Sequence, residues 1–161
     1  MKNTAGGAQT GGKAPVFTGA SSNTQAPVTG TTALTLLKTL SLPAGALLQN
    51  GSLESDCLLS FNNSAGTKTF TITVNGVTVQ QLSFTTQLSA RIGMVLRNRN
   101  SLSSQVAPPA GGSGATGGSG AAPSTYTIDT SQALTINYYA QLQTGTDNAA
   151  VEYANVKVAN A

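Results

Sequence analysis

The segment KTFTITVNGVTVQQLSF, residues 68–84, limits the folds open to this chain more than any other. Phe70, Ile72 and Val74 alternate with threonines, the period-two pattern of a strand that has one face in a core and a Thr-rich face in water. Asn75-Gly76 follows directly and favours a two-residue hairpin turn, because both central residues of that turn need positive φ. The segment therefore predicts a β-hairpin.

Other segments have the same strand character and are bounded by Gly, Asn or Pro. They are ALTLLKTLSL (33–42), LESDCLLSFN (53–62), LSARIGMVLRN (88–98), TYTIDT (125–130), LTINYYAQLQ (134–143) and VEYANVKVAN (151–160). About eight strands predict an all-β fold, an antiparallel jelly-roll β-sandwich, with a plain Greek-key sandwich as the alternative.

The last of these segments carries a specific expectation about its two faces. Strict alternation places Val151 and Tyr153 on one face, and Glu152, Ala154 and Val156 on the other. The same alternation in residues 134–143 directs Tyr138 into the core and Tyr139 outward. Tyr139 is therefore a candidate contact for a glycan.

The 161 residues suit one domain, and two segments stand apart from it by composition. Residues 1–30 are rich in Gly, Ala, Ser and Thr and contain no acidic residue, which predicts an extended N-terminal arm. Residues 31–161 then form the β-sandwich domain. A Gly-rich stretch at residues 108–123 interrupts the strands and predicts a loop.

Charge and hydropathy exclude several classes of partner. Eight basic and five acidic residues give a net charge of +3, too little for the clustered basic face of a nucleic-acid-binding protein. No segment approaches the roughly 20 apolar residues that cross a bilayer, and the N-terminus lacks the apolar run of a signal peptide. We expect no nucleic-acid or membrane partner, and synthesis in the cytoplasm.

Few residues offer catalytic chemistry. The chain has no histidine, which removes Ser-His-Asp and Cys-His sites, and Cys57 stands alone in an apolar run as a small buried hydrophobe. Glu54 and Asp56 share one strand face, which suits either a paired-carboxylate hydrolase or a calcium site, or else charge that keeps a sheet rim soluble. We favour the soluble rim and expect no enzyme activity, no metal and no cofactor.

The densest polar cluster is Arg97-Asn98-Arg99-Asn100. Two arginines one residue apart on a strand share a face. Three interpretations fit them: a solvated strand end, fork-like contacts from Arg97 and Arg99 to carboxylates or carbonyls of a neighbouring subunit, or binding of an anionic ligand.

Taken together, these segments resemble a jelly-roll domain of structural proteins of tailed bacteriophages. The resemblance spans about residues 34–106, and more loosely the C-terminal strands. It rests on a first strand that ends in Leu-Pro-Ala and on Asn-Gly, Asn-Asn and Thr-Lys-Thr segments. A Gly at the hairpin and Arg-Asn-Arg-Asn before Ser-Gln complete the pattern. The arm and the Gly-rich loop lie outside it.

The resemblance implies a virion component on the capsid surface, often a homotrimer, with no catalytic residue to carry over. We therefore expect a capsid decoration, or cement, protein that bridges subunits of the major capsid protein. Val16, Phe17 and Val28 would be the apolar anchors of its arm. The alternative is a tail-fibre or head-fibre domain that binds a receptor glycan. An enzyme such as a depolymerase, acting through Glu54 and Asp56, is the third hypothesis.

Overall fold

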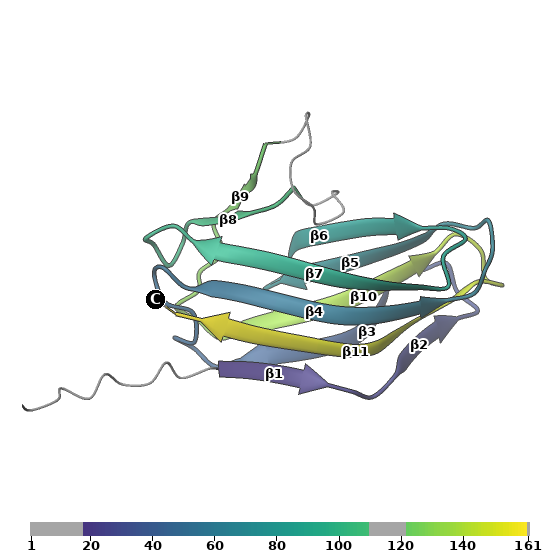
Figure 1. Ribbon diagram of the computed structural model, residues 1–161, viewed down its shortest axis with the longest axis horizontal. Coiled ribbons are helices and arrows are strands. Elements are labelled where there is room, and N and C mark those ends of the chain that lie inside the picture. The colour runs from purple at the N-terminus through teal and green to yellow at the C-terminus, as the bar shows by residue number, and fades with distance from the viewer. Residues whose placement is uncertain (1–17, 110–121, 161) are drawn as a thin grey trace, which may run out of the picture.

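A computed structural model describes residues 18–109 and 122–160, and Figure 1 shows two packed layers of antiparallel strands. The all-β sandwich predicted from the sequence is confirmed. The strands are β1 (Thr18–Ser22), β2 (Ala26–Thr29), β3 (Thr35–Leu42), β4 (Ser52–Phe61), β5 (Lys68–Val74), β6 (Val77–Phe84), β7 (Ser89–Asn98), β8 (Gln105–Ala107), β9 (Ser124–Tyr126), β10 (Leu134–Leu142) and β11 (Asn148–Ala159). Val16 and Phe17 lie outside the described residues.

The strands divide into a large and a small sheet. The large sheet has the order β1-β11-β4-β7-β8-β9, with β2 also paired to β11, and the small sheet has the order β3-β10-β5-β6. The chain crosses between the sheets from β3 to β4, back from β4 to β5, and again from β10 to β11. These crossings are compatible with the jelly-roll connectivity that the resemblance implies. The jelly-roll connectivity itself stays a prediction.

The predicted hairpin is confirmed as the β5–β6 pair. Asn75 and Gly76 have φ angles of 48° and 80°, as a two-residue turn with two left-handed residues requires. Leu134, Ile136 and Tyr138 are fully buried between the sheets, so the alternation expected in β10 is also confirmed. Cys57 is buried as well, and burial raises the pKa of its thiol to about 12.

Strict alternation in β11 is wrong. The register between β11 and β4 shifts between Val151 and Tyr153, so Glu152 is the extra residue of a β-bulge. As a result Val151 lies in the core together with Ala154 and Val156 rather than opposite to them. The bulge keeps the Glu152 side chain out of the apolar layer, and the segments on both sides of it stay paired with β4.

The predicted boundary of the N-terminal arm at residue 30 is also wrong. Thr18–Ser22 and Ala26–Thr29 are strands β1 and β2, and both pair antiparallel with β11. Val28, expected as an arm anchor for a partner, is 6% exposed and belongs to this domain's own core. The physical reason is that the outer edge of β11 carries backbone N–H and C=O groups that need partners.

The corner between β1 and β2 is held by a buried lysine from the opposite sheet. Lys38 of β3 donates hydrogen bonds from Nζ to the Ser22 carbonyl at 3.4 Å, to Ser22 Oγ at 3.1 Å and to the Thr24 carbonyl. Across the corner, Gln25 Nε2 donates to Glu152 Oε1 at 2.9 Å, and Ser60 Oγ donates to the same oxygen. These hydrogen bonds lower the pKa of Glu152, whereas burial lowers the pKa of Lys38.

The Gly-rich stretch predicted as a loop joins two short strands. Ala107 at the end of β8 pairs with Ser124 at the start of β9, so the two ends of the stretch are held side by side. Residues 110–121 lie outside the described part of the chain.

We expect Lys38→Met to loosen β1 and β2 selectively. The variant removes the donor that satisfies the corner carbonyls, and an unmet buried hydrogen bond costs on the order of 1–3 kcal/mol. Amide hydrogen exchange over residues 18–29 should then accelerate by roughly tenfold or more, while β10 is unaffected. Lys157→Met, a lysine change on an exposed face of β11, is the control. Equal exchange in the two variants would contradict the role given to Lys38.

A second prediction concerns two threonines on β5. Thr73 Oγ1 is buried and has no hydrogen-bond partner among the described residues, whereas Thr71 Oγ1 accepts from Gln81 Nε2 at 3.2 Å. Thr73→Val should raise the free energy of unfolding by about 1 kcal/mol, because it removes an unsatisfied buried hydroxyl with little change of shape. Thr71→Val should give no such gain. Urea denaturation of both variants measures the difference, and a larger loss for Thr73→Val than for Thr71→Val would refute it.

Candidate functional site

The end of the sandwich where β1 begins and β7 and β11 end, at the left of Figure 1, is called the near end below. Thr18 pairs with Val158, Val158 with Leu53, and Leu53 with Leu96, so one row of residues crosses four strands. At about 4.8 Å per strand, the start of β1 lies about 14 Å from β7.

The RNRN cluster lies at this near end and alternates as a strand should. Arg97 and Arg99 are exposed, while Asn98 is buried and donates from Nδ2 to the Leu48 carbonyl and to Thr130 Oγ1, both at 2.8 Å. Within the described ranges, no carboxylate forms an ion pair with Arg97 or Arg99. Asn98 therefore fixes the strand end, and the two guanidinium groups face solvent on either side of it. The three interpretations of these arginines stay predictions.

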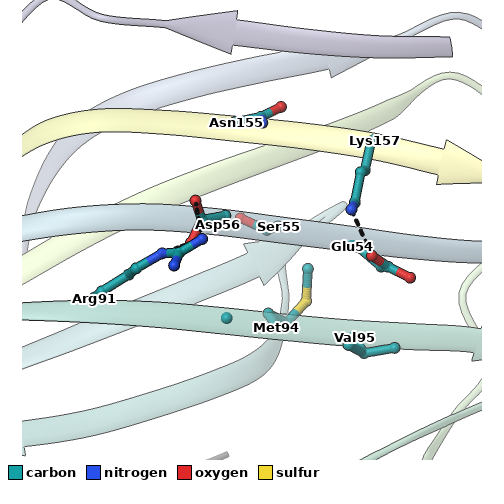
Figure 2. A pocket seen from close by; sticks show the side chains of 9 residues that line it. Glu54, Ser55, Asp56, Arg91, Met94, Val95, Asn155 and Lys157 are labelled. Atoms are coloured by element: carbon teal, nitrogen blue, oxygen red, sulfur yellow. Dashed lines mark hydrogen bonds and ion pairs between the residues drawn. The ribbon is translucent and has the colours of Figure 1, made fainter. Parts of the chain in front are cut away.

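Figure 2 shows a hollow of about 330 Å³ on the outer face of β4, β7 and β11. Arg91 donates to both carboxylate oxygens of Asp56, at 2.7 Å from Nε and 3.2 Å from Nη2. Lys157 Nζ lies 3.1 Å from Glu54 Oε2. The contact with Asp56 raises the pKa of Arg91, and Tyr153 donates its hydroxyl to Asp56 Oδ2 at 3.3 Å.

This geometry corrects the location expected for Glu54 and Asp56. They share a face, as predicted, but β4 is a central strand of the large sheet and not a rim. Each carboxylate faces a cation on a different neighbouring strand, Asp56 toward β7 and Glu54 toward β11. Exposed ion pairs of this kind tie adjacent strands together weakly. The described residues contain no group of three or more potential metal-ligating side chains.

A second hollow, of about 270 Å³, lies at the opposite end of the sandwich, called the far end, where β10 ends and β5 and β11 begin. It is lined by Thr32, Thr67, Thr69, Gln141, Leu142 and Gln143. Thr67 N–H donates to Gln143 Oε1 at 2.7 Å, and Gln141 Nε2 donates to the Thr32 carbonyl at 3.3 Å. No charged side chain lines this hollow.

A buried polar network fixes the loop that presents Thr67. Lys68 is 1% exposed, and its Nζ donates to Ser64 Oγ at 2.6 Å, to the Gly66 carbonyl at 3.1 Å and to the Thr85 carbonyl at 2.7 Å. Ser64 Oγ in turn donates to Asp147 Oδ1 at 2.5 Å. This last bond, with smaller contributions from Asn62, Thr144 and the charge of Lys68, lowers the pKa of Asp147.

Sequence reasoning found Tyr139 but missed the far end hollow. Tyr139 is half-buried, points outward and accepts from Asn137 Nδ2 at 3.4 Å. It precedes Gln141 by two residues on the same face of β10, so Tyr139 stands one outward row from the hollow, although it is not among the residues that line it. The available signal was the recurrence of Thr and Gln at these strand ends, but a Thr-rich strand face by itself predicts only contact with water.

The fold therefore defines an all-β sandwich protein. No protein-family model and no curated protein matches the chain. Among solved structures, the chain is similar to the crystal structure of dimeric latent PorU from Porphyromonas gingivalis, with 12% identity over 99% of this chain and a TM-score of 0.44. This chain spans 14% of the length of that one. So low a TM-score carries no argument about function. In the part of the chain that is described, no helix is long and apolar enough to span a membrane.

The far-end network predicts how stability depends on acid. Because the folded pKa of Asp147 lies below its ordinary value of 3.8, its carboxylate stabilises the fold above that pH. The stabilisation is lost as the pH falls below 3.8 through the lowered value. Asp147→Asn should therefore flatten the fall in thermal midpoint between neutral pH and pH 2. Glu54→Gln, which removes a carboxylate of the large sheet outside this network, is the control; an unchanged acid slope in Asp147→Asn would refute the assignment.

Proposed function

We propose that the chain is a structural protein of a tailed-phage virion, a decoration or cement protein that binds the major capsid protein through its near end. The observation that carries the proposal is the row from Thr18 to Leu96. Val16 and Phe17, the two predicted apolar anchors, precede Thr18 in the sequence, and Thr18 begins β1 about 14 Å from the strand that carries Arg97.

The chemistry of this end suits a protein surface. Exposed guanidinium groups offer planar, forked donors to carboxylates and carbonyls of a neighbouring subunit. The apolar residues before Thr18 would add buried area beside them. Each contact is modest, but many copies on one shell, or the homotrimer that the resemblance implies, would add avidity. The protein would bridge neighbouring capsid subunits and oppose their separation.

The location is tested by imaging. Gold-labelled antibody against this chain should decorate the heads of intact particles of the phage that encodes it. Label restricted to tails or fibres would reject a role on the capsid and would favour the fibre-domain alternative.

The binding end is tested by co-sedimentation of the full chain with capsids that lack it. The double variant Arg97→Ala/Arg99→Ala should bind at least about tenfold more weakly, because two exposed charge-assisted contacts are removed. Arg91→Ala is the matched control, since Arg91 is an exposed arginine of the same strand whose partner is Asp56 of its own chain. Undiminished binding by the double variant, or an equal loss with Arg91→Ala, would contradict binding through the near end.

A further inference from the structure

The two outer faces of the sandwich differ in charge. The outer face of the large sheet carries the ion pairs of Figure 2 and the exposed Arg97. The outward residues of the small sheet are instead uncharged. They are Leu36, Thr39 and Ser41 of β3, Thr69, Thr71 and Thr73 of β5, Thr78, Gln81 and Ser83 of β6, and Thr135, Asn137, Tyr139 and Gln141 of β10.

Hydrogen bonds between side chains order this uncharged face. Thr39 Oγ1 donates to Asn137 Oδ1 at 2.7 Å, and Asn137 Nδ2 donates to the Tyr139 hydroxyl. On the next strands, Thr69 Oγ1 and Ser83 Oγ lie 3.3 Å apart. These contacts preorganise hydroxyl and amide groups, so a ligand would lose little side-chain entropy on binding them.

Tyr139 and the far-end hollow occupy consecutive outward rows of the small sheet, and these rows together are called the strip below. Tyr139 pairs with Thr71, and Gln141, in the next outward row, pairs with Thr69. The hydrogen bonds within the hollow leave Gln141 Oε1 and Gln143 Nε2 without a protein partner among the described residues. The strip therefore offers an aromatic ring, one amide acceptor and one amide donor, with threonine hydroxyls around them.

We infer that this strip binds an uncharged oligosaccharide. A sugar presents an apolar C–H face that packs on an aromatic ring, and hydroxyls that both donate and accept. Such a ligand is bound by amide and hydroxyl groups held in fixed positions, and it needs no charged side chain in the site. The hollow, of about 270 Å³, lies just below the roughly 300–1,000 Å³ of small-molecule sites, so it would take only the end of a sugar chain.

The two ends of the molecule would then serve different partners. Val158 at the near end and Asn148 at the far end of β11 are about 33 Å apart, at about 3.3 Å per residue. A chain held at its near end would thus present the strip away from the attachment. The inference itself rests on the strip and stands whether or not the near end binds a capsid.

The test uses the full chain and an array of neutral and sialylated glycans, followed by titration of maltose, lactose, cellobiose and N,N′-diacetylchitobiose by ¹H–¹⁵N NMR. At least one neutral glycan should bind and perturb amides near Tyr139, Gln141 and Thr67. Tyr139→Ala and Gln141→Ala should each weaken that binding by about tenfold or more. Tyr153→Ala, a tyrosine on the outer face of the large sheet, is the matched control.

Three results would overturn the inference that the strip binds a neutral sugar. Absence of any neutral binder, or binding that Tyr139→Ala leaves unchanged, would overturn the inference. So would a chain that self-associates through this face, seen as a mass above the monomer that Tyr139→Ala and Gln141→Ala abolish, since the strip would then be covered by a second copy. Co-sedimentation with capsids should be unaffected by Tyr139→Ala, so failure of this inference and failure of the near-end proposal are told apart.

Discussion

Strand β11 hydrogen-bonds along both of its edges, and the arrangement of the large sheet depends on that double pairing. One edge pairs with β4, and the other pairs with β2 before the bulge and with β1 after it. The bulge at Glu152 shifts the inward–outward alternation by one residue, so that apolar residues face the core both before and after it. Without this bulge, either Val151 or Ala154 would face water, and one of the two short strands would lose its register.

The corner between β1 and β2 couples the two sheets. Lys38 belongs to the small sheet, yet its ammonium group binds the carbonyl of Ser22 in the large sheet and that of Thr24 in the corner. A buried lysine with oxygen partners fixes geometry more than it adds stability, because its desolvation offsets much of the gain. Here the fixed geometry holds the end of β1, at Ser22, against the small sheet. A local polar contact thus helps to hold in place the strand that begins at Thr18, at the near end.

Much of the fold could be predicted from the sequence because its strands are strongly periodic. The Asn75-Gly76 turn and the alternation in β7 and β10 depend on local rules that tertiary structure did not override. β1 and β2 could not be predicted in this way, since they are short, contain Gly or Pro and pair only through long-range contacts. β8 could not be predicted because it has only three residues. The bulge at Glu152 could not be predicted for a related reason, because it shows only in the pairing of β11 with β4, a strand remote in sequence.

The candidate sites also differ in how much of each could be predicted from the sequence. The exposure of Arg97 and Arg99 and the outward direction of Tyr139 follow from alternation alone. The ion pairs of Glu54 and Asp56 and the far-end hollow required the neighbours of each strand, and no spacing in the sequence reveals them. Residues from three separate segments line that hollow, which is typical of sites built where strands end.

Photo-crosslinking on the assembled particle tests the central claim that the near end faces the capsid. A photoreactive amino acid would replace Ser103, an exposed residue of the loop after Arg99, or Ser83, an exposed residue on the outer face of the small sheet. The account predicts adducts with the major capsid protein from position 103 and none from position 83. Adducts from position 83 alone would mean that the molecule binds the particle by its other face, and would contradict the account.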